Sequence, residues 1–161
     1  MWKFGDDMNT YVSTSEEETI ELAGNFAASV KPGDVIAMRG GLGAGKTVFA
    51  RGLAIGLGCG DEVTSPTFAL VHEYHGEARS LYHFDMYRVS GFESLCSTGF
   101  FDYLDTGGIL LVEWSENIEE HLPDNVKTIT MEITDNNTRK ITISKHPPTA
   151  VGTLFSKEGK G

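Results

Sequence analysis

A glycine-rich loop between a short apolar run and an amphipathic segment constrains the fold of this chain more than any other sequence feature. Val35 to Met38 form the apolar run, typical of a buried strand, and residues 47–57 place apolar side chains on one face of a predicted helix. Between them stands Gly40-Gly41-Leu42-Gly43-Ala44-Gly45-Lys46-Thr47, which matches the pattern G-x-x-x-x-G-K-[ST]. A strand, this loop and a helix in that order predict a phosphate-binding loop within an α/β fold.

The residue types of this loop each have a physical reason. Glycines let backbone N–H groups converge on phosphate oxygens without Cβ clashes, and the following helix presents its positive end to the anion. Lys46 is expected to reach the β- and γ-phosphates of a nucleotide, and the Thr47 hydroxyl to bind Mg²⁺. The other nucleotide-binding positions expected in the loop are Leu42, Gly43, Ala44 and Gly45.

The rest of the chain predicts one α/β domain over residues 1–144, followed by a loosely ordered tail at 145–161. Besides the strand at 35–38, strands are expected at 8–13, 68–74, 80–87, 109–112, 126–134 and 140–144. Helices are expected at 16–30 and 47–57, with one or two short helices within 92–105. Two hairpins among these strands make the sheet mixed. The fold class is therefore an α/β, P-loop NTPase-like three-layer sandwich with a partly antiparallel sheet.

Charge and composition exclude several classes of function. Lys and Arg total 13 and Asp and Glu total 23, so the net charge is −10. This argues against unaided binding of nucleic acid and against a membrane partner, because both need clustered cations. The sequence shows neither an apolar leader nor 18 consecutive apolar residues, so we expect a cytoplasmic protein. The sequence has two cysteines. Their number is compatible with one disulfide, but in a cytoplasmic protein we expect free, buried thiols.

Two acidic residues are candidates for the magnesium and catalytic side of the site. Glu113 ends the aliphatic run at 109–112, and Asp85 stands near the end of another predicted strand. The carboxyl edge of parallel strands is where such acids are found in nucleotide-binding α/β proteins. One is expected to hold magnesium while the other orients the attacking water, with the assignment open. The alternative for Asp85 is a structural ion pair with Arg88.

Three further segments help to decide which class of nucleotide-binding protein the sequence encodes. Thr64-Ser65-Pro66-Thr67 follows the predicted helix, where switch segments offer a hydroxyl to the γ-phosphate and magnesium, although an ordinary turn has the same composition. Trp114, beside Glu113, suits a core position or a nucleotide contact. Residues 105–108 match the D-x-x-G pattern of GTPases but precede a strand, and the sequence has no N-K-x-D to read guanine, so a GTPase is disfavoured.

Four motifs in order, GLGAGKT, SPTF, HFDMYR and LLVEWSE, make the sequence resemble the TsaE (YjeE) family over roughly residues 13–143. That family is the ATPase of bacterial tRNA threonylcarbamoyladenosine biosynthesis. The resemblance implies a Mg²⁺-dependent ATPase, weak alone, that acts with TsaB and TsaD while these partners carry most tRNA contacts. TsaD transfers the threonylcarbamoyl group to adenosine beside the anticodon.

The resemblance also implies roles for single residues. Thr67 is the switch-like threonine, Asp85 and Glu113 are the metal-side acids together with Thr47, and Trp114 lies near the nucleotide. Glu116 and Arg139 close on the nucleotide. Two positions depart from the family, which usually has an acidic residue where Gly41 stands and often a basic one where Asn117 stands. These two departures are expected to affect contacts to the nucleotide or to a partner.

Two other functions compete with this reading. A small-molecule P-loop kinase needs a lid with several arginines to screen the transferred phosphoryl group. After Asp85 the sequence holds only Arg88 and Arg139, which disfavours a kinase. A nucleotide-binding regulator without meaningful hydrolysis is the second alternative.

Overall fold

The computed structural model describes residues 8–66 and 70–145, so Thr67 and the predicted tail beyond residue 145 lie outside it. Within these residues one sheet contains seven strands in the order β1-β7-β6-β2-β5-β4-β3. Their bounds are β1 Met8–Ser13, β2 Val35–Arg39, β3 Val71–His75, β4 Ser80–Asp85, β5 Ile109–Glu113, β6 Lys127–Asp135 and β7 Thr138–Ser144.

The centre of the sheet is parallel and its edges are antiparallel. Strand β2 pairs in parallel with β5 and with β6, and β4 pairs in parallel with β5. At the edges, β3 pairs antiparallel with β4, and β7 pairs antiparallel with both β6 and β1. The mixed sheet with two hairpins, predicted from the sequence, is confirmed.

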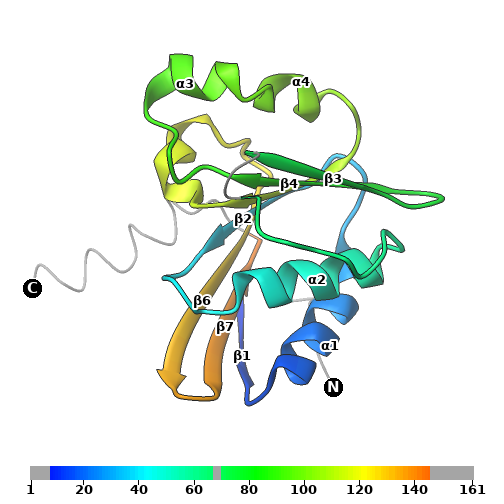
Figure 1. Cartoon of the computed structure of the whole chain (residues 1–161), viewed down its shortest axis with the longest axis vertical. Coiled ribbons are helices and arrows are strands. Elements are labelled where there is room, and N and C mark those ends of the chain that lie inside the picture. Colours follow the sequence, from blue (N-terminus) through cyan, green and yellow to red (C-terminus); the bar gives the residue numbers. More distant parts are fainter. Residues whose placement is uncertain (1–7, 67–69, 146–161) are drawn as a thin grey trace, which may run out of the picture.

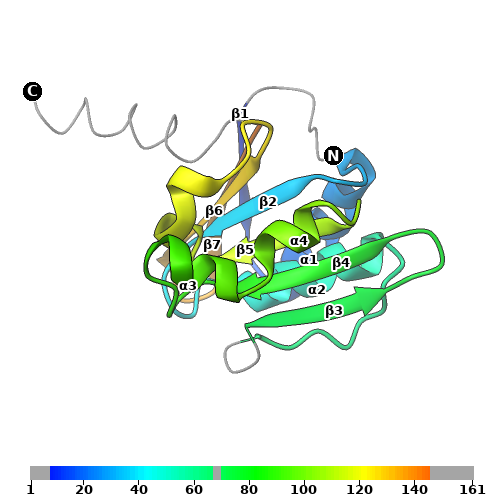
Figure 2. The same cartoon turned by 90° about the horizontal axis from the view of Figure 1, so that it is seen from above.

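Helices cover both faces of this sheet. They are α1 Glu16–Phe26, α2 Lys46–Gly56, α3 Gly91–Ser97 and α4 Phe100–Leu104, with 3₁₀ segments at Ala27–Ser29 and Ser115–His121. Helices α1 and α2 lie against one face, and α3 and α4 against the other (Figures 1 and 2). The predicted three-layer α/β sandwich is therefore confirmed.

The apolar run of β2 divides its side chains between two cores. Ile36 and Met38 belong to the core under α1 and α2, whereas Val35 and Ala37 belong to the core under α3 and α4. All four side chains are fully buried. A strand covered on both faces reads as a continuous apolar run, which is why the sequence revealed it.

Helix α1 begins at a cap and packs closely on α2. The Ser15 hydroxyl accepts a hydrogen bond from the Glu18 backbone N–H at 3.1 Å, which is the usual contact of an N-cap serine. The Glu18 carboxylate accepts a hydrogen bond from the Thr14 N–H at 2.8 Å, and this bond lowers the pKa of Glu18. A Cβ at Gly52 of α2 would lie 2.6 Å from the Ile20 carbonyl, so the two helices approach at a glycine.

Several element ends differ from the predictions. The helix expected over 16–30 is α-helical only to Phe26 and finishes as a 3₁₀ turn, a common way for a helix to tighten at its end. Strand β4 ends at Asp85 instead of 87, because the Asp85 carboxylate accepts from the Tyr87 N–H at 2.9 Å and turns the chain. The 3₁₀ segment at Ser115–His121 was not predicted.

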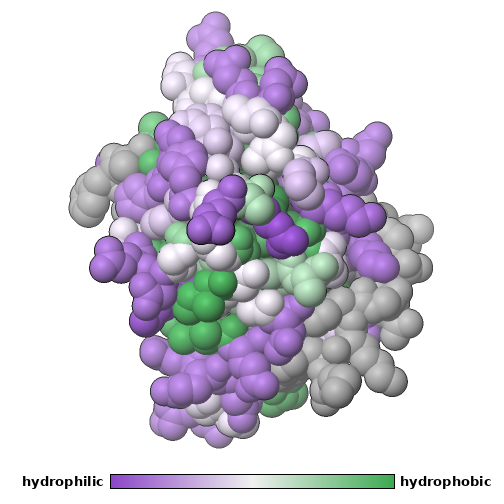
Figure 3. Space-filling model, turned by 90° about the vertical axis from the view of Figure 1, so that its right-hand side faces the viewer, coloured by the Kyte–Doolittle hydropathy of each residue, from purple (hydrophilic) through white to green (hydrophobic). Residues whose placement is uncertain are grey.

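The surface seen from one side is mostly polar. The side of the molecule where the β3–β4 hairpin turn lies is mainly hydrophilic, with limited hydrophobic patches (Figure 3).

Both cysteines are free, as expected. Cys59 is buried, as predicted, whereas Cys96 is exposed. Among the described residues, every helix is too short or too polar to cross a bilayer.

Candidate functional site

The glycine-rich loop sits at the carboxyl edge of the parallel strands. Strand β2 ends at Arg39 and α2 begins at Lys46, so the loop joins the central strand to the helix that covers it (Figure 1). In the sheet register, Glu113 at the end of β5 stands opposite Met38 of β2 on one side and Asp85 of β4 on the other. Both candidate acids therefore end strands at the edge where the loop begins.

A cavity of about 560 Å³ lies at this edge. Nine of the residues singled out from the sequence line it, and these are Leu42, Gly43, Ala44, Gly45, Lys46, Thr47, Asp85, Glu113 and Trp114. Three other lining residues, Glu16, Val48 and Tyr87, were not predicted as site residues, and the fourth, Ser65, belongs to the switch-like segment at 64–67. Glu116 is exposed on the 3₁₀ segment and does not line the cavity. Its role stays a prediction, as does that of Thr67 outside the described residues.

Among the residues that line the cavity, Lys46 most clearly indicates an anionic ligand. Its side chain is 8% exposed, and its Nζ has no hydrogen-bond partner among the described residues. The Nζ lies 4.3 Å from the centroid of the Trp114 ring, a cation–π contact. Burial of an ammonium without a hydrogen-bonding anion is costly, so a phosphate at this position would supply the missing partner.

Trp114 and Tyr87 form an aromatic wall beside Lys46. Their ring centroids are 4.9 Å apart, and Trp114 has the unusual backbone angle φ of 56° directly after β5. A positive φ is uncommon for a bulky residue, and strained backbone positions of this kind cluster at functional sites. The turn at Trp114 directs the chain away from the sheet, so that the ring borders the cavity instead of joining the strand.

The two acids are buried but differ in their partners. Asp85 is 5% exposed and its Oδ1 accepts from the Tyr87 N–H. In the described part of the chain Asp85 forms no ion pair, so the alternative of a structural pair with Arg88 finds no support. Glu113 is 4% exposed, and its Oε1 lies 3.1 Å from Nε2 of His83.

His83 is a site residue that sequence reasoning missed. It stands two residues before Asp85 in the same strand, and residues two apart in a strand share a face. That spacing was the available signal. The partner of His83 comes from β5, thirty residues further along the chain, and only the sheet pairing brings the two together.

The donor set suits magnesium bound through a nucleotide better than a protein-built metal cage. No group of three or more His, Cys, Asp or Glu side chains among the described residues is arranged to hold a metal ion. Mg²⁺ commonly keeps several waters and takes one or two protein ligands together with substrate phosphates. The Thr47 hydroxyl and one of the two acids, all lining the cavity, fit that requirement.

Arg139 of the β6–β7 hairpin contacts the loop directly. Its Nη2 donates to the Gly43 carbonyl at 3.2 Å, and the same side chain borders a second cavity of about 540 Å³. The two cavities share the lining residues Glu16, Gly43, Gly45 and Val48, so both border the same part of the loop. Arg139 thus lies beside the loop, although it does not line the first cavity.

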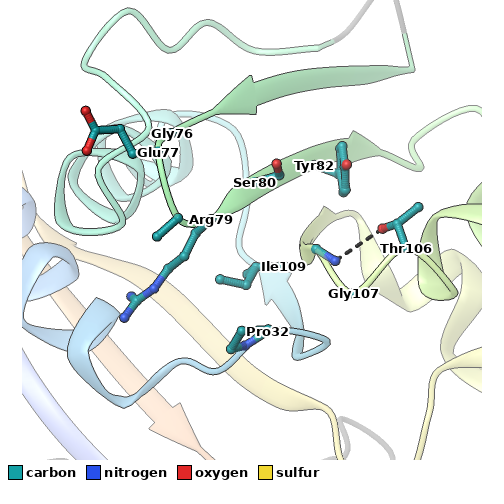
Figure 4. A pocket seen from close by; sticks show the side chains of 11 residues that line it. Pro32, Gly76, Glu77, Arg79, Ser80, Tyr82, Thr106, Gly107 and Ile109 are labelled. Carbon is teal, nitrogen blue, oxygen red and sulfur yellow. Dashed lines mark hydrogen bonds between the residues drawn. The ribbon is translucent and has the colours of Figure 1, made fainter.

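A separate polar pocket of about 250 Å³ opens at the opposite edge of the sheet, near the first residues of β4 and β5 (Figure 4). Its lining includes Pro32, Arg79 and Thr106, and none of the residues predicted from the sequence to bind nucleotide or metal. Among its lining residues the charged side chains are Arg79 and Glu77. This combination offers neither paired acids nor a buried cation, so the loop edge is the candidate site.

Two adjacent glycines give a matched test of the loop. A Cβ at Gly40 would lie 2.8 Å from the Met131 carbonyl, whereas a Cβ at Gly41 would meet no heavy atom within 4 Å. We expect Gly40→Ala to lower the free energy of unfolding by about 1–3 kcal/mol, as overpacking does. Gly41→Ala is expected to change it by less than about 0.5 kcal/mol. Urea unfolding of both variants checks this, and equal losses would mean that the loop is displaced from β6.

Comparison with known proteins gives concordant matches. The family model described as threonylcarbamoyl adenosine biosynthesis protein TsaE matches residues 13–141. The TsaE protein of Treponema pallidum is 36% identical over 133 residues, covering 83% of this chain and 98% of its own. TsaE of Bacillus subtilis is 40% identical over 143 residues, covering 89% and 86%. The crystal structure of Bacillus subtilis YdiB superposes with a TM-score of 0.71 at 33% identity, covering 95% of both chains.

Proposed function

Because the chain belongs to the TsaE family of threonylcarbamoyl adenosine biosynthesis proteins, we propose that it is the subunit that binds and hydrolyses ATP for threonylcarbamoyl modification of tRNA adenosine next to the anticodon. The observation that carries the ATP-binding step is the buried Lys46 ammonium, which has no protein partner in the described residues and lies in a cavity with two buried acids. This arrangement supports a polyphosphate ligand with a bound divalent cation.

The loop and the two cavities that border it suggest how ATP lies. The backbone amides from Leu42 to Gly45 would hold the phosphates at the start of α2, and Lys46 would contact the β- and γ-phosphates. The nucleoside would extend towards the second cavity, where Arg139 holds the Gly43 carbonyl. ATP is preferred to GTP in this proposal, because no N-K-x-D motif is present to read guanine.

Hydrolysis would use the acids at the ends of β4 and β5. Mg²⁺ supplies neutralisation of the charge on the phosphate oxygens when it is bound. Thr47 with either Asp85 or Glu113 would hold the ion, and the remaining carboxylate would orient the attacking water. Thr67, the switch-like residue of the family resemblance, would complete the γ-phosphate side. The segment that carries Glu116 would close on the nucleotide.

The partners of the proposed subunit are homologues of TsaB and TsaD. A net charge of −10 disfavours direct binding of tRNA by this chain, so the partners would carry most tRNA contacts. The proposed location is the cytoplasm, where tRNA modification takes place.

We predict that the isolated chain hydrolyses ATP slowly and that TsaB and TsaD together accelerate it. The described residues that line the main cavity include no arginine, so an arginine finger in cis is not in place there. Partners can supply such a group or order a loop, and either raises the rate. Phosphate release is measured with the chain alone, with each partner and with both.

Pull-down of the two partners in the presence of ATP, ADP or no nucleotide tests assembly separately. Equal turnover with and without both partners, under conditions in which the pull-down shows assembly, would contradict partner stimulation. Phosphoryl transfer from ATP to a small molecule, with no effect on tRNA modification, would contradict the proposed function itself.

A further inference from the structure

We propose that His83 is a positioning residue for Glu113: it donates a hydrogen bond from Nε2 to Glu113 Oε1 and so fixes the carboxylate in the orientation that ATP hydrolysis needs. This inference rests on the proposed ATPase function. It assigns to the strand β4 histidine a role distinct from direct contact with nucleotide or metal.

The sheet pairing brings the two side chains together. Strands β4 and β5 are parallel, with His83 opposite Leu111 and Asp85 opposite Glu113. Leu81 and Leu111 belong to the core under α1 and α2, so alternation along each strand places His83, Asp85 and Glu113 on that same face. This is the face from which α2 and its N-terminal loop approach the site.

The direction of the hydrogen bond follows from the chemistry of its two ends. An ionised Glu113 can only accept, so the Nε2 that lies 3.1 Å from its Oε1 must carry the proton. The Nδ1 of His83 is buried with no hydrogen-bond partner among the described residues. One bond therefore orients the imidazole ring, and that bond goes to the candidate catalytic acid.

Stability alone gives little reason for a histidine at this position. The side chain of His83 is fully buried, and Leu81 and Leu111, on the same face of the sheet, belong to the apolar core under α1 and α2. A buried imidazole with an unsatisfied Nδ1 incurs a desolvation cost that an apolar side chain of similar size avoids. The Glu113 contact is the feature that distinguishes histidine from such a residue. With Oε1 engaged, one oxygen of Glu113 remains available for a water or a metal ion.

Three substitutions at His83 separate positioning from a structural role. His83→Phe keeps a ring but removes the donor, and is expected to lower kcat for ATP hydrolysis by about 10–100-fold, as loss of an outer-shell partner does. Its dissociation constant for ATP is expected to stay within a few-fold of the original protein. His83→Gln, whose amide donates from a similar position, is expected to recover most of kcat. His83→Asn, whose shorter side chain cannot bring its amide to the same position, is not expected to recover kcat.

Two controls sharpen the kinetic result. His75→Phe, at an exposed histidine at the end of β3, makes the same exchange far from the cavity and is expected to leave kcat unchanged. In a Glu113→Gln background, His83→Phe is expected to lower kcat little further, because His83 and Glu113 act together and each substitution alone already disrupts their interaction. Additive losses, or a His83→Gln variant as slow as His83→Phe, would overturn the proposal and indicate a packing role.

A measurement on the nucleotide-free protein tests whether His83 Nε2 donates to Glu113, and it requires no ATP hydrolysis. Nitrogen-15 NMR of labelled histidine, with His83 assigned by its absence from the His83→Gln spectrum, is expected to show a slowly exchanging proton on Nε2. Glu113→Ala should accelerate that exchange. A proton on Nδ1 alone, or exchange unaffected by Glu113→Ala, would overturn the proposal. Absence of ATP turnover in the unsubstituted protein with its partners would instead contradict the proposed ATPase function.

Discussion

Glu113→Gln and Asp85→Asn are each expected to slow ATP turnover by about 10²–10⁴-fold, the range that loss of a positioned acid or base produces. Both substitutions keep the size of the side chain and remove its charge. Lys46 and the loop amides would still hold the phosphates, so the affinity for ATP should change little. The lost interactions are those with magnesium or the attacking water, which matter most in the transition state.

Turnover must be measured per folded molecule, with the melting temperature of each variant determined in parallel. Glu120→Gln provides a matched control, because Glu120 is exposed on the 3₁₀ segment that follows Trp114 and does not line the cavity. A variant with reduced stability but normal turnover would assign that acid a structural role. Turnover near that of the unsubstituted protein in both variants would mean that neither carboxylate is catalytic.

Lys46→Ala is expected to weaken ATP binding by about 1.5–3 kcal/mol, the value of a hydrogen bond to a charged group. This corresponds to roughly 10–150-fold in the dissociation constant. The physical reason is that the Lys46 ammonium has no described protein partner in the nucleotide-free chain, where it rests on the Trp114 ring. ATP therefore gains a charge-assisted contact without competing against an existing ion pair.

The stability of the Lys46→Ala variant distinguishes loss of a ligand contact from loss of fold. Removal of an unpaired buried ammonium should leave the melting temperature of the nucleotide-free protein unchanged or raised. Lys31→Ala, at an exposed lysine before β2, is the control of the same substitution outside the site. An unchanged ATP affinity in Lys46→Ala would contradict the assignment of the loop.

The features predicted correctly from the sequence are those encoded by neighbouring residues. The continuous apolar run of β2, the glycine loop and the periodicity of α2 together located the strand, loop and helix that border the main cavity. The acids Asp85 and Glu113 were found for a related reason: each ends a strand, and the loop indicated which edge of the sheet mattered. In the structure both line one cavity with Lys46.

The features that were missed depend on contacts between distant segments. The bond between His83 and Glu113 spans thirty residues, and that between Arg139 and the Gly43 carbonyl spans 96. The spacing of His83 and Asp85 and the family resemblance at Arg139 point to the residues but not to the atoms they contact, because strand order and register are set by the whole sheet. The turn at Trp114, with its positive φ, was missed because a bulky residue at that angle opposes local preference.

The central claim is that this chain binds ATP through the loop at the end of β2 with the help of magnesium. Calorimetric titration with ATP, with and without Mg²⁺, and with GTP under the same conditions, tests it most directly. We expect one ATP per chain, tighter binding with Mg²⁺, weaker binding of GTP, and loss of affinity in Lys46→Ala. Preference for GTP, or ATP binding that is equally tight in Lys46→Ala, would contradict it.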